Sequence, residues 1–332
     1  MGAPELSVFD WGSGGVAPVA PPAEVSFLDE TLRDGLQSPS VRQPSLGEKV
    51  SLLHLIGGVG IATANVGYPG SGSAARRDAE ALCREIAAAG LSLGAKCAGR
   101  TCANDVLPVV EIAQRTGLAL EMGMFLGVSP LRIRTEGWEF DRLMRLADHW
   151  AGFATRWGVR VLFVTEDTTR SRPEDIARIY QTAVRAGAAR VCIADTVGCA
   201  TPMGAHALVR FVRTTLDAAG AAGVGIDWHG HNDRGLAVAN SLAAALAGAD
   251  RLHGTALGVG ERVGNAAIEH LLANAFRLGW ARPRLELVPS YLQAACSALG
   301  IRHGGDLPLV LESLRRLASS GPRRSDLRLK AS

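Results

Sequence analysis

The sequence predicts an α/β protein built as a closed barrel of eight parallel strands, each followed by a helix. Short apolar runs alternate with amphipathic segments from residue 25 onward. Eight such units follow one another over roughly 250 residues, the usual size of a (β/α)₈ barrel. Polar residues recur where the apolar runs end, which is where barrels of this kind carry their active sites. An open, doubly wound sheet is the alternative, and eight units of similar length favour closure.

The predicted elements follow one period along the chain. The segments between the apolar runs read as helices, and residues 76–90 and 174–187 show apolar residues at three-and-four spacing before a terminal glycine. We expect a flexible N-terminal arm over residues 1–24, a barrel over 25–280 and a short helical extension without a regulatory domain over 281–332. The predicted strands are residues 25–32, 63–69, 91–99, 118–125, 159–166, 190–196, 225–231 and 251–259.

Composition excludes several classes of protein. The 332 residues are 47% hydrophobic and 20% charged, with a net charge of +3, too mild to indicate nucleic acid or an anionic membrane as a partner. No apolar run approaches the roughly 20 residues of a membrane helix, and the N-terminus lacks the pattern of a secretory signal. The six cysteines show no paired spacing and are expected to be reduced thiols. We expect a cytoplasmic enzyme.

Unusual polar residues follow five of the predicted strands. Because all strand ends of a parallel barrel meet at one rim, these residues are expected to converge there. They are Arg33, Asp34 and Gln37 after the first strand, Glu166 and Asp167 after the fifth, Asp195 and Thr196 after the sixth, His229 and His231 at the seventh, and the segment "GVGERVGN" after the eighth.

The histidine pair indicates a metal site. Side chains alternate along a strand, so His229 and His231 point the same way and Gly230 points away. Two imidazoles can bind one metal ion and leave room for a carboxylate, for which Asp34 is the natural candidate, while Asn265 can add a neutral oxygen. A hydrogen-bonded structural pair is the alternative for a bare His-x-His, and the nearby rim carboxylate favours a metal. His253, on the eighth strand, can face either layer.

The glycine-rich segment "GVGERVGN" is not a dinucleotide-binding loop. Its glycines stand at 258, 260 and 264, which misses the required spacing, and it follows the last strand instead of the first.

Two blocks of sequence resemble one enzyme family. "DETLRDGLQSP" and "HGHNDRGLAVANSLAAALAGADRLHGTALGVGERVGNAAIE" are similar to the signatures of the 2-isopropylmalate, homocitrate and citramalate synthases, with hydroxymethylglutaryl-CoA lyase as a cousin. The resemblance covers roughly residues 25–280. It implies a TIM barrel that condenses acetyl-CoA with a 2-oxoacid in a metal-dependent Claisen-type reaction and releases CoA. Barrels of this family often dimerise, so we expect a homodimer.

The resemblance also implies roles for single residues. Asp34, His229 and His231, with Asn265 nearby, would hold Mg²⁺, Mn²⁺ or Zn²⁺. Arg33 would stabilise oxyanion charge on the oxoacid. Thr196 would bind the substrate carboxylate, and Gln37 would orient ligand or water near the metal. Glu166 would take part in proton transfer, or it would be the structural partner of an arginine such as Arg170. Arg100 and Val164 would contribute to substrate binding.

Departures from the family pattern concern the substrate. Asn65 stands where relatives carry a glutamate, and Gly123 and Arg132 stand where they commonly carry histidines. Arg234 replaces a small or apolar residue after "HND" and favours an oxoacid with a second anionic group. A 2-isopropylmalate synthase is the first interpretation, and a homocitrate-, citramalate- or phosphonomethylmalate-type synthase is the alternative.

Two other functions stay open. A lyase is less favoured because the cousin's cysteine is missing from the loop after the eighth strand. A barrel that binds metal and ligand without turnover is the third hypothesis, since the relatives' later glycine–histidine segment is absent and His303 is the only histidine in the extension that could replace it.

Overall fold

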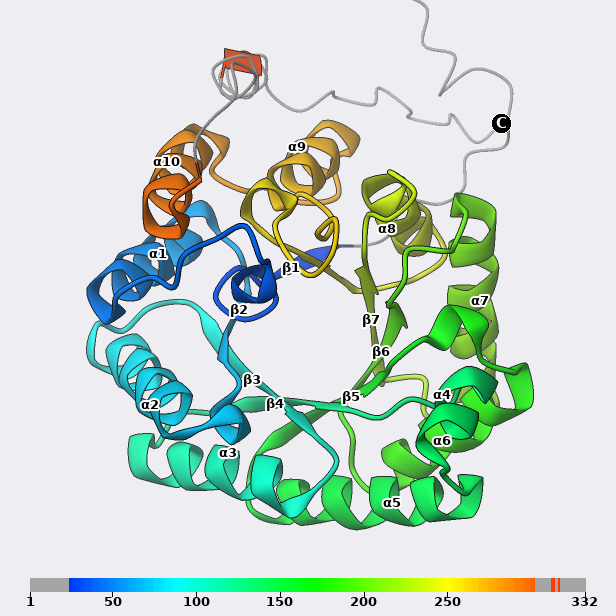
Figure 1. Ribbon diagram of the computed structural model, residues 1–332. Coiled ribbons are helices and arrows are strands. Elements are labelled where there is room, and N and C mark those ends of the chain that lie inside the picture. The colour runs from blue at the N-terminus through cyan, green and yellow to red at the C-terminus, as the bar shows by residue number, and fades with distance from the viewer. Residues whose placement is uncertain (1–23, 302–311, 314–315, 317–332) are drawn as a thin grey trace, which may run out of the picture.

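A computed structural model describes residues 24–301, 312, 313 and 316. Eight parallel strands close in sequence order into one barrel, and helices surround it (Figure 1). The predicted (β/α)₈ fold is therefore confirmed. The strands are β1 (Ser26–Asp29), β2 (Thr63–Gly67), β3 (Gly94–Arg100), β4 (Glu121–Phe125), β5 (Arg160–Thr165), β6 (Arg190–Asp195), β7 (Gly225–Gly230) and β8 (Arg251–Gly254).

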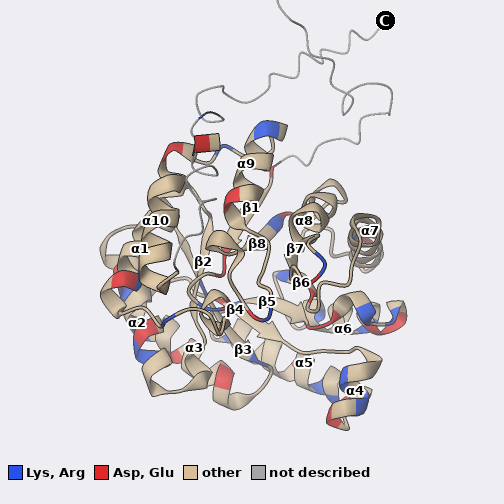
Figure 2. Ribbon diagram, turned by 45° about the horizontal axis from the view of Figure 1, so that its top comes forward, with Lys and Arg blue, Asp and Glu red and all other residues tan. Residues whose placement is uncertain are grey.

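The helices form the outer layer, and both signs of charge are spread over them (Figure 2). Between β4 and α5 lies one short helix, α4, that the periodicity does not predict. The helices are α1 (Leu46–Val59), α2 (Ser73–Ala88), α3 (Ala103–Thr116), α4 (Pro130–Glu136), α5 (Phe140–Arg156), α6 (Pro173–Arg185), α7 (Pro202–Ala218), α8 (Ala237–Leu246), α9 (Ile268–Leu278) and α10 (Val288–Leu299).

The first and last strands end earlier than predicted because side chains and turns take over their hydrogen bonds. After β1, the Thr31 amide donates to the Asp29 carboxylate at 2.8 Å, and the Gly35 amide turns back to the Glu30 carbonyl. After β8, Ala256–Gly258 forms a 3₁₀ turn. The residues lost from the strands are the ones that reach over the barrel mouth, so the early strand ends create the rim.

The barrel interior contains charged groups in addition to its apolar layers. Asp227 on β7 accepts from Arg251 on β8 at 2.7 Å and from Arg190 on β6 at 2.6 Å, and Arg251 also reaches Glu121 on β4 at 2.7 Å. All four side chains are buried or mostly buried. Burial alone would raise the pKa of Asp227, but the two arginines outweigh it and hold that pKa far below the ordinary value. The network ties four strands together below the site.

Helix α10 lies beside α1, at the junction of the first and last parts of the chain (Figure 1). Its buried Tyr291 donates to Asp29 and contacts the Thr31 hydroxyl at 3.0 Å, so the helix holds the loop that follows β1. Residues 1–23 of the predicted arm, and His303 in the predicted extension, lie outside the described residues. Within the described part, no helix has the length and apolar character needed to cross a bilayer.

A buried acid at this junction predicts a pH effect on stability. Burial raises the pKa of Glu269, on α9, from 4.5 to about 7. The stability that protonated Glu269 provides is fully present below pH 4.5 and is lost as the pH rises through about 7. This loss lowers the free energy of unfolding by up to about 3 kcal/mol. We expect Glu269→Gln to remove this loss, measured by urea unfolding at pH 5 and pH 8. The exposed Glu286→Gln serves as the control, and an unchanged pH dependence in Glu269→Gln would contradict the prediction.

Candidate metal site and active site

Asp34, His229 and His231 converge at the mouth of the barrel. The Asp34 Oδ2 lies 3.6 Å from His229 Nε2 and 3.8 Å from His231 Nε2, and the two imidazole nitrogens are 3.3 Å apart. All three side chains are buried. The atoms lie within 4.8 Å of one another, as the ligands of a single ion must. The two histidines therefore point the same way, as strand alternation predicts.

The loop after β1 positions the carboxylate. Asp34 Oδ1 accepts from the Asn265 side-chain amide at 2.9 Å, which leaves Oδ2 facing the histidines. Asn265 forms a bridge with His231 through its backbone, so the loop after β8 is fixed to the end of β7. A side chain at Gly264 would overlap the Gly258 carbonyl, and its φ is +93°. The glycines of "GVGERVGN" thus serve a tight turn that delivers Asn265.

The protonation states suit a divalent cation. Burial, helped by His231, lowers the pKa of His229 well below 6.5, so its imidazole is neutral and can act as a ligand. Burial would raise the pKa of Asp34, but Arg33 and the two histidines lower it below 3.8. Asn265 Oδ1 is buried without a partner among the described residues, and the Nδ2 of the same side chain contacts the Asp34 carboxylate at 2.9 Å. Two imidazole nitrogens and a carboxylate therefore fit Mg²⁺, Mn²⁺ or Zn²⁺.

Beneath this group lies a buried carboxylate that the sequence did not single out. Glu30, directly after β1, accepts from Arg33 at 2.8 Å, from Asn65 at 2.7 Å and from Lys96 at 2.5 Å. Burial would raise the pKa of Glu30, yet Arg33, Lys96 and His253 hold it well below 4.5. His253 contacts the Asp227 carboxylate at 2.8 Å, so its side chain faces the barrel interior and not the surrounding helices.

The metal site opens into a cavity of about 210 Å³. Thr196 lines it, and its Oγ1 accepts from the Asp167 amide at 2.7 Å, so the hydroxyl proton is directed elsewhere. Gln37 lines it and accepts from Arg33 at 3.0 Å. Val164 and Glu166 also face this cavity, as predicted for residues at the end of β5. The rim thus brings together nine of the eleven residues that the sequence indicated, counting Asn265 through its contact with Asp34.

Two arginine assignments differ from the sequence interpretation, and a third arginine lies beside the metal cavity. Arg234 is exposed and donates to the Cys199 carbonyl at 2.9 Å, so it does not line the cavity. Arg100 is bound by Asp105 at 2.9 Å and lies outside the metal cavity, but it lines an adjoining chamber, so its role in substrate binding stays a prediction. Arg170 pairs with Asp167 at 2.6 Å and not with Glu166. The partner of Glu166 is Arg132, at 3.3 Å.

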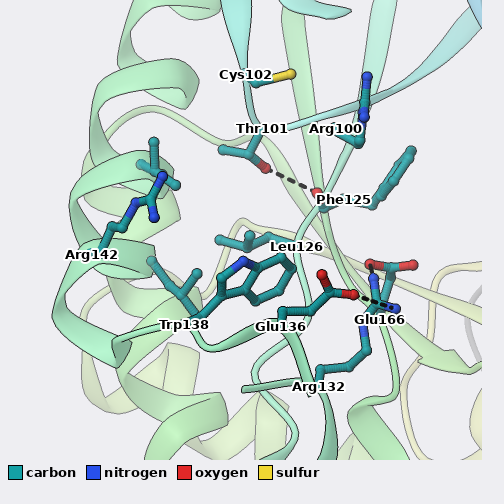
Figure 3. A pocket seen from close by; sticks show the side chains of 12 residues that line it. Arg100, Thr101, Cys102, Phe125, Leu126, Arg132, Glu136, Trp138, Arg142 and Glu166 are labelled. Carbon is teal, nitrogen blue, oxygen red and sulfur yellow. Dashed lines mark hydrogen bonds and ion pairs between the residues drawn. The ribbon is translucent and has the colours of Figure 1, made fainter. Parts of the chain in front are cut away.

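A second chamber of about 410 Å³ adjoins the metal cavity and shares Phe125 and Glu166 with it. It lies between the loops after β3 and β4 and the helices α4 and α5 (Figure 3). Figure 3 shows the Arg132–Glu166 ion pair beside the Trp138 ring, which Arg132 also covers at 5.7 Å. Burial raises the pKa of Glu166 above 4.5, although Arg132 opposes the shift.

The profile of the HMGL-like family matches residues 24–289. The chain belongs to the HMGL-like family. Its barrel is similar to a crystal structure of hydroxymethylglutaryl-CoA lyase from Pseudomonas aeruginosa, with a TM-score of 0.73 at 18% identity over 88% of this chain and 99% of that one. At that identity the likeness concerns the fold.

Two curated relatives match the HMGL-like chain more closely in sequence. Homocitrate synthase AksA from Methanopyrus kandleri is 36% identical over 255 residues, which is 76% of this chain and 59% of that protein. A 2-isopropylmalate synthase from Lactococcus lactis subsp. cremoris is 34% identical over 252 residues, 75% of this chain and 47% of that protein. The chain therefore spans about half the length of the curated relatives it matches.

Proposed function

We propose that the protein condenses acetyl-CoA with a 2-oxoacid in a Claisen-type reaction that depends on a divalent metal and releases CoA, as a 2-isopropylmalate synthase does. The observation that carries the proposal is the buried Asp34–His229–His231 group beside the Arg33 guanidinium, at the mouth of a small cavity. The similarity to 2-isopropylmalate and homocitrate synthases supports it. Homocitrate-, citramalate- and phosphonomethylmalate-type synthases remain the alternatives for the oxoacid.

The chain's own residues would handle the charge on the oxoacid. A bound divalent ion would supply a Lewis acid for the ketone and carboxylate oxygens. Arg33, held by Glu30 at 2.8 Å and by Gln37 at 3.0 Å, has its guanidinium fixed before substrate arrives. Such a preorganised donor stabilises the alkoxide that forms from the ketone. The free hydroxyl proton of Thr196 is available for the oxoacid carboxylate.

Glu166 is placed to take a proton from the co-substrate. The methyl group of acetyl-CoA must lose a proton, its carbon then bonds to the ketone carbon, and water hydrolyses the thioester to release CoA. Glu166 lines both chambers, so a thioester entering from the second chamber would meet it beside the oxoacid. Its raised pKa makes the carboxylate a stronger base than an exposed glutamate. The apolar Phe125, Leu126 and Trp138 would exclude water around the thioester arm.

The test is thiol release from acetyl-CoA with Mg²⁺ or Mn²⁺ across pyruvate, 2-oxoisovalerate, 2-oxoglutarate, oxaloacetate and phosphonopyruvate, with the protein's own thiols blanked. We expect release with one oxoacid and none in its absence. Cleavage of 3-hydroxy-3-methylglutaryl-CoA without any such release would instead establish a lyase. Metal-dependent oxoacid binding with neither reaction would establish a binding protein and reject the proposed synthase.

A further inference from the structure

Lys96 is a buried cation inside the metal cavity, and its surroundings are unusual for a lysine. It lies on β3, is 3% exposed, and its side chain points into the barrel toward Glu30. Lysine is almost never fully buried unless it is paired, so its presence calls for a reason. A Cβ at residue 123 on β4 would overlap the Cε of Lys96. Gly123 therefore leaves the space through which the lysine stem crosses the interior.

The ammonium of Lys96 keeps donors for a ligand. An ammonium has three donors, and in the described part of the chain Glu30 is the one acceptor that Lys96 meets. Glu30 itself is shared, since it also accepts from Arg33 and Asn65. Small or apolar side chains also line the cavity that the ammonium enters, namely Ala98, Val164, Cys192 and Ala194.

The charges of the cavity do not balance with a singly charged oxoacid. Arg33 and Lys96 cancel Glu30 and Asp34, so a bound divalent ion leaves two positive charges in a buried space. Of the two other carboxylates of the cavity, Glu166 pairs with Arg132 at 3.3 Å. Glu261 has a side chain that is 46% exposed, so solvent screens its charge; its neighbour Arg262, at 3.6 Å, lies closer to Asp233, at 2.8 Å. An uncompensated buried charge is costly, so a ligand with two anionic groups fits best.

We infer that Lys96 binds a second anionic group, a carboxylate or phosphonate, on the side chain of the 2-oxoacid. This inference rests on the proposed function and narrows it to dianionic oxoacids. The keto end lies at Asp34 and the histidines, and Glu30, the Lys96 partner, has a carboxylate oxygen within 4.8 Å of the His229 ligand nitrogen. The two anionic ends of one small molecule can therefore be bound at once. Lys96 takes the role that the sequence suggested for Arg234.

The first experiment compares matched oxoacids by calorimetry, with Mg²⁺ present and acetyl-CoA left out. Each dianion is paired with the analogue in which an isopropyl group replaces the distal carboxylate: oxaloacetate with 4-methyl-2-oxopentanoate, and 2-oxoglutarate with 5-methyl-2-oxohexanoate. Charge-assisted hydrogen bonds predict about a 10- to 100-fold preference for one dianion in the natural protein. Equal or tighter binding of both isopropyl analogues would overturn the inference.

The variants test whether Lys96 causes that preference. Lys96→Met keeps the stem and removes the charge, so we expect the preference to fall below about threefold, with the isopropyl analogue bound as before. Lys96→Arg should retain the preference. If Lys96→Met fails to fold, Gly123→Ala displaces the lysine stem while every charge remains, and it should lower dianion affinity in the same way. A preference that survives in the folded variant would overturn the inference.

The experiments distinguish a failure of the anion site at Lys96 from a failure of the proposed synthase activity. Dianion preference lost in Lys96→Met, without thiol release from acetyl-CoA, would support the anion site and reject the synthase. Thiol release with 2-oxoisovalerate, unaffected by Lys96→Met, would support the synthase and reject the anion site.

Discussion

His229→Ala is expected to abolish metal binding at the barrel mouth and to lower the rate of thiol release from acetyl-CoA at least about 1,000-fold. A Lewis acid lowers the activation free energy by several kcal/mol, and each 1.36 kcal/mol that is lost slows the reaction about tenfold. The variant keeps Asp34 and His231, which are 3.8 Å apart and leave the ion with one nitrogen and one carboxylate. Titration calorimetry with Mn²⁺ measures the affinity directly, independent of turnover.

The matched control for this prediction is His270→Ala. His270 is exposed on α9 and is not part of the cluster, and its removal changes the histidine content by the same amount. We expect Mn²⁺ affinity and turnover to stay within twofold of the natural protein, as is usual for exposed positions. If His229→Ala bound Mn²⁺ as tightly as the control, the cluster would not be the metal site.

Asp227→Ala is expected to destabilise the fold by about 3–5 kcal/mol, the usual cost of removing one partner of a buried ion pair. The substitution would leave Arg190 without its 2.6 Å contact and Arg251 with Glu121 as its remaining carboxylate partner. It would also remove the 2.8 Å partner of His253. Urea unfolding at pH 7, monitored by tryptophan fluorescence and circular dichroism, measures the change.

Asp217→Ala provides the comparison for Asp227→Ala, since Asp217 pairs with Arg213 at 3.6 Å on the surface of α7 and is 50% exposed. A surface pair contributes roughly 0–1 kcal/mol, so this variant should be nearly neutral. If Asp227→Ala does not fold, Asp227→Asn retains one acceptor oxygen and should fall between the two. Equal stability of Asp227→Ala and Asp217→Ala would show that the interior network does not hold the barrel together.

The sequence was sufficient for the barrel and for bringing Asp34, His229 and His231 together, because both depend on periodic geometry. Strand alternation alone places His229 and His231 on one side, and strand order alone places Asp34 at the same rim. It could not place Arg100 or Arg234, since both lie at or beyond strand ends, where a long side chain follows the nearest acceptor. Asp105 captures the first and the Cys199 carbonyl captures the second.

The sequence did not single out the buried charges Glu30 and Lys96 for a different reason. Glu30 and Lys96 are 66 positions apart, and their contact depends on β1 and β3 lying on either side of β2 in the barrel. One signal was available, because a lysine between small residues in "GAKCAG" is out of place on a buried strand. The missing side chain of Gly123 was visible too, but only the fold shows that the two belong together.

That pairing restricts how this barrel could have changed over time. A side chain at position 123 would meet the Cε of Lys96, so it can enter only if the end of the lysine moves away from Glu30. The effect of a substitution at either position therefore depends on the residue at the other. A side chain gained at 123 is accommodated more easily where residue 96 is short, and a lysine gained at 96 reaches Glu30 where residue 123 is glycine. Positions 96 and 123 are thus epistatic, and engineering efforts should vary the two jointly.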